Sequence, residues 1–167
     1  KIKFIEMEKI KRIIISEPLL LLALPVSLIP LLMIIILRLF FRIRIGFLRS
    51  DRIGHFAANT ELYLCERDVN RYNHNKPLDL FYFPRKPCNH QLARMWAREL
   101  TVLPWFFMRP LDLIIRSFNS LSFLHVFEAK GGDRDIDNLM EKTSPHLKFN
   151  DVEERRGEAG LLAMGIP

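Results

Sequence analysis

Residues 18–37 form the longest hydrophobic run of the chain and contain no charged side chain. As one straight helix rising about 1.5 Å per residue, the run would span about 30 Å, the thickness of the hydrocarbon core of a bilayer. Pro25 and Pro30 lie inside it, and each removes a helical hydrogen bond. The run therefore predicts a segment in or on a membrane, as a kinked spanning helix or as a hairpin that enters and returns. A buried core helix is the remaining alternative.

After this run, short apolar stretches alternate with amphipathic ones. Strand composition and alternation occur over residues 42–48, 78–83 and 101–104. Strand–helix alternation at this spacing predicts an α/β fold with a parallel sheet of the Rossmann type. Three short strands make a thin sheet, and the chain stops where another strand is expected. We therefore expect a truncated domain.

Helices are expected between and after these strands. The first follows a cap at Asn59 or Thr60, and the next follows Asn89. The ranges expected to be helical are 61–72, 90–100, 105–124 with an interruption at Pro110, 135–142, and 152–164 after Asn150 or Asp151, while 147–149 is expected to be extended.

Two units are expected, a membrane-associated helical segment over 1–41 and an α/β domain over 42–167. Residues 1–16 alternate isoleucines with Lys and Glu, a pattern that suits a membrane interface. The net charge is +6, and much of it flanks the apolar run. The flanking basic residues are Lys1, Lys3, Lys9, Lys11, Arg12, Arg38, Arg42, Arg44, Arg49 and Arg52. Anionic lipid headgroups are their simplest partner.

Other functional classes find little support in the composition. No basic stripe with interleaved aromatic residues appears after the apolar run, so nucleic-acid binding is not expected. Cys65 and Cys88 are too few for a secreted disulfide scaffold and predict free thiols in a reducing compartment. The pair Cys88 and His90 supplies too few ligands for a metal site, and no cofactor motif is present.

The loop after the first predicted strand carries the most candidate chemistry. Ligands of open α/β sheets lie beyond the carboxyl ends of the strands. This loop gathers Arg49, Ser50, Asp51, Arg52, Gly54 and His55. Gly54 permits close backbone approach, and His55 is a candidate general base near neutral pH. The plain alternative is a polar turn whose arginines face lipid headgroups.

The loop after the second predicted strand is a weaker candidate. Lys86 and Asn89 face the same side of the predicted sheet and could bind a phosphate or a sugar hydroxyl. The alternative is a capped helix start beside a buried thiol at Cys88.

A set of short strings adds a resemblance to a known family. The strings are RSDRIGH at 49–55, NTELYL at 59–64, DLFY at 79–82, CN at 88–89, MW at 95–96, LP at 103–104, RP at 109–110, EKTSPHL at 141–147 and GIP at 165–167. Together they resemble a family of bacterial glycosyltransferases linked to surface polysaccharide synthesis. The resemblance runs from about Arg38 to the end of the chain.

The resemblance implies a two-domain GT-B enzyme, of which this chain would be the N-terminal, acceptor-side half. The loop is also similar to that of bacterial heptosyltransferases, whose first strand ends in Arg-x-Gly-Asp with the Asp as base. Here His55 follows Gly54 at that place. The implied reaction moves a sugar from a nucleotide donor to an acceptor hydroxyl, with His55 taking the proton. Arg49 and Arg52 would hold phosphate or acceptor charge.

The implied partners are a nucleotide sugar, held mainly by a C-terminal donor domain, and a glycan or lipid-linked acceptor. The implied location is the cytoplasmic face of the inner membrane. Besides His55, the expected acceptor site comprises Arg49, Ser50, Asp51, Arg52, Gly54, Asn59, Lys86 and Asn89. This chain alone is expected to be inactive. The alternative function is a non-catalytic membrane adaptor with a basic surface for lipid or a partner.

Overall fold

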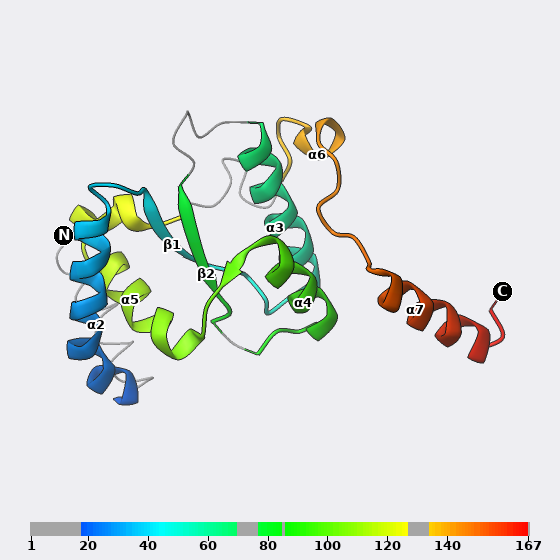
Figure 1. Ribbon diagram of the computed structural model, residues 1–167, viewed down its shortest axis with the longest axis horizontal. Coiled ribbons are helices and arrows are strands. Elements are labelled where there is room, and N and C mark those ends of the chain that lie inside the picture. The colour runs from blue at the N-terminus through cyan, green and yellow to red at the C-terminus, as the bar shows by residue number, and fades with distance from the viewer. Residues whose placement is uncertain (1–17, 70–76, 85, 127–133, 167) are drawn as a thin grey trace.

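The computed structural model describes residues 18–69, 77–84, 86–126 and 134–166, so the predicted interfacial pattern at 1–16 lies outside it. Its centre is a three-stranded parallel sheet in the order β1-β2-β3 (Figure 1). The strands are β1 (Ile43–Phe47), β2 (Leu78–Tyr82) and β3 (Thr101–Val102). The predicted α/β class with a parallel sheet is thereby confirmed.

Helices cover both faces of this sheet. On one face, α3 (Ile53–Asp68) and α4 (His90–Glu99) pack over Phe81, with Phe56 and Trp96 fully buried between the layers. On the other face, α5 (Trp105–Ser117) packs over Ile45 and Tyr82. Apolar side chains dominate both faces of the sheet, as expected for a parallel sheet between helices, and one ion pair, Arg44 with Asp79, lies on the face that α3 covers.

The chain then returns to the free edge of β1. After the 3₁₀ helix η1 (Asn119–Leu124), His125 forms a parallel bridge with Ile45, and the amide of Val126 donates to the carbonyl of Ile45 at 2.9 Å. Gly46 makes this approach possible, because a Cβ there would lie 2.9 Å from the Cβ of Val126. The segment at His125 therefore lies on the edge of β1 opposite to β2, whereas β2 and β3 follow each other on the other side.

Helix α2 (Pro18–Leu37) lies along α5 (Figure 1). Leu31 is buried in the same hydrophobic cluster as Met108, Leu111 and Ile115 of α5. A helix over 18–37 is thus present as one continuous element with Pro25 and Pro30 inside it, so the hairpin alternative is wrong, and one side of the helix packs against the α/β core. Among the described residues, no helix is long and apolar enough to cross a membrane.

Three of the predicted helices have wrong bounds, one of them the helix predicted over 135–142, which in the structure is only α6 (Leu139–Lys142). Helix α3 begins at Ile53 instead of after Asn59 or Thr60, because Phe56 on its first turns is buried in the core. Arg52, in an extended conformation, takes the N-cap position without a side-chain cap bond. The predicted helix over 105–124 divides at Phe118 into α5 and η1, while Pro110 is accommodated inside α5.

The C-terminal part leaves the core (Figure 1). Helix α6 (Leu139–Lys142) packs on α3, and α7 (Asp151–Ala163) extends away from the sheet with no buried residue. The predicted extended piece over 147–149 pairs with no described strand. Asn150 and Glu153 form a capping box at the start of α7, which confirms the predicted cap.

Candidate functional site

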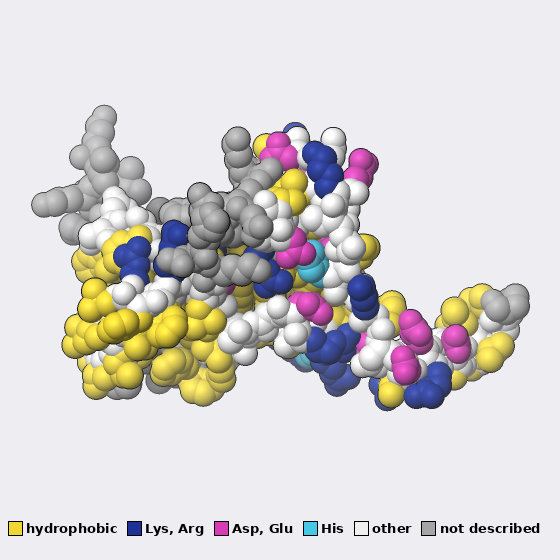
Figure 2. Space-filling model, turned by 45° about the horizontal axis from the view of Figure 1, so that its top comes forward, with side chains coloured by type: hydrophobic (Ala, Val, Ile, Leu, Met, Phe, Trp, Pro, Cys, Tyr) yellow, Lys and Arg dark blue, Asp and Glu magenta, His cyan; other side chains and the backbone are white. Residues whose placement is uncertain are grey.

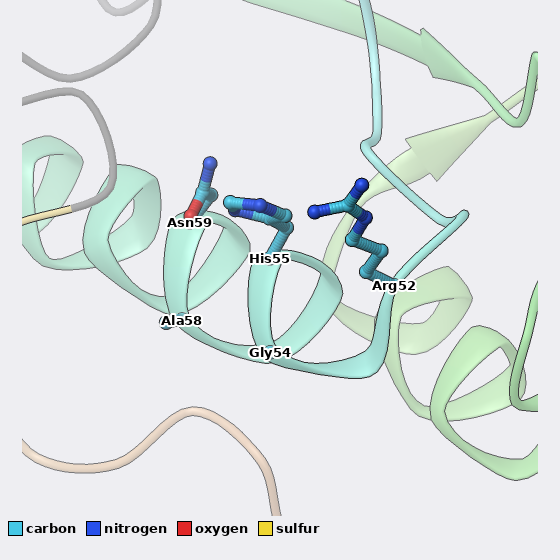
Figure 3. A pocket seen from close by; sticks show the side chains of 5 residues that line it. All are labelled: Arg52, Gly54, His55, Ala58 and Asn59. Atoms are coloured by element: carbon cyan, nitrogen blue, oxygen red, sulfur yellow. The ribbon is translucent and has the colours of Figure 1, made fainter.

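An open hollow lies on the first turns of α3, directly after the carboxyl end of β1. It measures about 430 Å³ and is lined by Arg52, Gly54, His55, Ala58 and Asn59. Figure 3 shows the side chains of Arg52, His55 and Asn59 in a row on one side of the helix. His55 and Asn59 are four residues apart, a spacing that places them on the same helix face. The structure thus brings together four of the predicted site residues.

The hollow also lies where the sheet offers a natural ligand crevice. β2 pairs with one edge of β1, and the later segment at His125 bridges the other edge, so the order of segments across the sheet reverses at β1. In open α/β sheets, ligands bind outside the carboxyl ends of the strands at such a reversal. The position of the hollow is therefore a consequence of the topology.

Two hydrogen bonds hold the first turn of α3 in place. The buried indole Nε1 of Trp96 donates to the carbonyl of Phe56 at 2.9 Å, which ties α4 to the turn that carries His55. The amide of Cys88 donates to the carbonyl of Ser50 at 2.8 Å, so the loops after β1 and β2 lie against each other. These contacts position the hollow on rigid elements.

Several features of the turn favour an anion or a polar ligand. The first turn of α3 has no acidic residue, and its amides carry the positive end of the helix dipole beside Arg52. Within the described residues, Ser50 Oγ and Asn59 Oδ1 are buried without a hydrogen-bond partner. Buried polar atoms are normally paired, so both atoms have unused hydrogen-bonding capacity next to the hollow.

No contact within the protein requires a glycine at position 54. It lies in the helix, and a Cβ added there would meet no atom within 4 Å. The space in front of its backbone is open, and close approach of a ligand to this backbone stays a prediction.

The remaining predicted residues lie outside the lining of the hollow. Arg49 is half-buried, while Asp51 and Lys86 are exposed. The side chain of Asn89 accepts a hydrogen bond from the amide of Leu92 at 2.9 Å and caps α4. The interpretation of Asn89 as a cap is therefore confirmed, whereas the buried thiol expected beside it is wrong, since Cys88 is exposed. Substrate binding by Lys86 and Asn89 stays a prediction.

A polar network between the sheet and α3 was not predicted from the sequence. Asp79 on β2 accepts hydrogen bonds from Arg44 Nε at 2.7 Å and Arg44 Nη2 at 2.6 Å, and a further one from Tyr63 OH. Burial of Tyr63, reinforced by the charge of Asp79, raises the pKa of the phenol. Arg44 and Asp79 are register partners on β1 and β2, and the polar positions in two apolar strands were the available signal.

A second buried network lies on the α5 face. Asp112 is fully buried and accepts hydrogen bonds from Tyr82 OH at 2.6 Å and Arg116 Nε at 3.0 Å, with His125 Nε2 at 3.6 Å. Burial, together with the neighbouring carboxylate, raises the pKa of Tyr82. This network joins β2, α5 and the segment that returns to β1, so it is structural support for the reversal.

One cluster has metal-ligating side chains. Ligand atoms of Glu61, Cys65 and His146 lie within 4.8 Å of one another. However, His146 Nδ1 already lies 2.9 Å from Glu61 Oε1, and Nε2 lies 2.9 Å from Asp68 Oδ2. Burial disfavours the imidazolium, but the hydrogen bonds to both carboxylates outweigh it and raise the pKa of His146. We interpret the cluster as a charged latch that holds the loop before α7 on α3.

Comparison with known proteins adds no relative, because no family model, curated protein or solved structure matches the chain.

Proposed function

We propose that the chain is the acceptor-side half of a membrane-associated glycosyltransferase. It would serve surface polysaccharide synthesis at the cytoplasmic face of the inner membrane. The observation that carries this proposal is the row of Arg52, His55 and Asn59 on α3, at the point where the strand order reverses beside β1. The strings that resemble bacterial glycosyltransferases include this same turn, residues 49–55.

The proposed chemistry assigns a distinct task to each residue of the hollow. His55 removes the proton from an acceptor hydroxyl as its oxygen bonds to the anomeric carbon of the donor sugar. The bond between that carbon and the phosphate oxygen breaks, and the electron pair leaves with the nucleotide. Arg52 and the amides of the first turn of α3 bind negative charge, and Asn59 hydrogen-bonds the acceptor.

The donor side belongs to a second α/β domain in this proposal. A GT-B enzyme binds its nucleotide sugar mainly in the C-terminal domain and closes the two domains around the acceptor. Such an arrangement needs an acceptor site that is open on its own, and the hollow on α3 is open. Catalysis would begin only when the donor domain covers it.

The test is sugar transfer by the protein that carries this chain together with a donor domain. Transfer of labelled sugar from a panel of nucleotide sugars to membrane-extracted acceptors is measured for His55→Ala. General-base catalysis contributes about 10²–10⁴-fold, so kcat should fall by at least about a hundredfold. His90→Ala is the matched control, because His90 is an exposed histidine at the start of α4, outside the hollow.

The alternative function, a non-catalytic membrane adaptor, makes the opposite prediction. An adaptor needs no base, so His55→Ala would retain every measurable property of the protein. Transfer by His55→Ala equal to that of His90→Ala would contradict the role of His55 as base. Absence of transfer in the wild type with all donors would favour the adaptor.

A further inference from the structure

A large apolar surface lies on the outer side of α2 and on the beginning of α5. Figure 2 shows it as a continuous area of hydrophobic side chains on one end of the molecule. On α2, Ile29 and Leu32 are 67% and 58% exposed, and Phe40 in the turn that follows is 77% exposed. On α5, Trp105 and Phe106 are 52% and 65% exposed. We call these residues and their exposed apolar neighbours the apolar surface.

The exposure on α2 follows from its sequence. Leu31 is buried against α5, while Ile29 and Leu32 are exposed on the outer side of the helix. A helix that packs by one side normally has polar residues on the other. Here both sides are apolar, so burial in the protein core accounts for only one of them. Exposed apolar patches of this kind mark sites of interaction with membranes or proteins.

The charge around the apolar surface favours a membrane over a protein as its partner. No acidic residue occurs between Glu17 and Asp51, so α2 and the turn after it have none. Exposed Arg42 and half-buried Arg38 follow the helix, and the Arg38 guanidinium lies 3.7 Å from the centre of the Phe123 ring. Figure 2 shows basic side chains along one edge of the hydrophobic area. An apolar face with a basic edge and no carboxylate complements anionic headgroups above acyl chains.

Packing decides how the helix meets the bilayer. The Leu31 side of α2 belongs to the same cluster as Met108 and Ile115 of α5, which is part of the α/β core. A helix that crossed the bilayer would have to separate from α5 and expose this cluster. We propose that α2 stays on α5 and that the apolar surface is embedded in one leaflet of a membrane that contains anionic lipid.

This inference rests on the proposed function only for its purpose, which is to hold the acceptor site near lipid-linked acceptors. Embedding in one leaflet would put the aromatic side chains of Trp105 and Phe106 at the depth of the headgroup and upper acyl region, where aromatic residues are enriched. Arg38 and Arg42 would lie among the phosphates. The surface is thus a peripheral membrane contact built from two segments that are distant in sequence.

The test uses flotation of the 167-residue chain with vesicles of phosphatidylcholine, alone or mixed with phosphatidylglycerol. The chain should float with the mixed vesicles, and the double variant Ile29→Glu/Leu32→Glu should bind them at least tenfold more weakly. The matched control is Val152→Glu/Leu162→Glu on α7, where the same charges replace residues that are 59% and 70% exposed. Because all four positions are exposed, circular dichroism should show equal helix content for the three proteins.

The emission of Trp105 reports the depth. Trp96 is fully buried, so a blue shift on vesicle binding should come from Trp105 and vanish in Trp105→Phe. Brominated lipids should quench this emission more strongly with bromine near the headgroup than near the chain end. The inference is overturned by absence of flotation, by equal losses in both double variants, or by stronger quenching from the chain end. A vesicle-free dimer that Ile29→Glu/Leu32→Glu dissociates would also overturn it, since a second copy would then cover the surface.

The vesicle test is independent of catalysis. Loss of flotation in a protein that still transfers sugar to a water-soluble acceptor would remove only this inference. Normal flotation of a protein without transfer activity would remove only the proposed function.

Discussion

Removal of the Asp79 carboxylate should destabilise the chain more than any exposed substitution. Asp79 accepts two hydrogen bonds from Arg44, at 2.7 and 2.6 Å, and a third from Tyr63. The side chains of Arg44 and Asp79 are only 13% and 5% exposed. In Asp79→Ala, the Arg44 guanidinium loses both of its hydrogen bonds to this carboxylate, and a hydrogen bond to a charged group contributes about 1.5–3 kcal/mol. The unpaired hydroxyl of Tyr63 adds about 1–3 kcal/mol, against a total stability of about 5–15 kcal/mol.

The assay is urea unfolding followed by circular dichroism, with the midpoint and slope fitted for each variant. Tyr63→Phe removes one hydrogen bond and leaves the ion pair, so it should cost about 1 kcal/mol. The double variant Arg44→Met/Asp79→Leu replaces the pair by apolar side chains of similar size and should be more stable than Asp79→Ala. This role of the ion pair is contradicted if Asp79→Ala lowers the free energy of unfolding no more than Tyr63→Phe does, or if the double variant is the least stable of the three.

Three further predictions concern the latch, the hollow and α7. His146→Gln should destabilise the fold by about 1–3 kcal/mol at pH 6, because hydrogen bonds to two carboxylates are lost. The pKa of His146 is raised in the folded protein, so the stabilisation by its charged form is fully present below the ordinary histidine pKa and is lost as pH rises through the pKa of the folded state. If His146→Gln lowered the free energy of unfolding in urea equally at pH 6 and pH 9, this dependence would be contradicted. Gly54→Ala should leave the fold intact or stabilise it by up to about 1 kcal/mol. If the acceptor approaches the backbone of Gly54, the substitution should raise the KM for the acceptor, and an unchanged KM would argue against that approach. The hydrogen bond from Arg98 lowers the pKa of Glu153 to about 2, so the contact between the start of α7 and α4 should persist as pH falls below the ordinary glutamate value and be lost only toward pH 2. Hydrogen exchange at the start of α7 measures this, with Glu153→Gln as comparison.

Much of the fold was predictable because apolar periodicity and caps act locally. The strands over 42–48 and 78–83 and the cap at Asn89 depend on neighbouring residues, and the structure contains all three. The start of α3 was mispredicted since neither Arg52 nor Gly54 is a typical helix-start signal, and burial of Phe56 outweighs that local preference. Local preference alone does not reveal which residue will reach the core.

The parts of the site that depend on long-range contacts were not predictable. The bridge of His125 with Ile45 joins two segments that are distant in sequence, and it places the segment at His125 on the edge of β1 opposite to β2. The bond from Trp96 to the Phe56 carbonyl and the latch at His146 likewise join segments far apart in sequence. The hollow itself was predictable in part, because Arg52, Gly54 and His55 directly follow a strand.

The most direct measurement of the central claim is binding of an acceptor to the hollow on α3. The probe is a short-chain prenyl diphosphate saccharide, titrated into the isotope-labelled 167-residue chain and followed by the imidazole C–H resonances of its five histidines. We expect a saturable shift of the His55 resonances that Arg52→Ala weakens, with the resonances of His90 and His146 unchanged. A titration that leaves His55 unmoved, or that moves all exposed histidines alike, would contradict it.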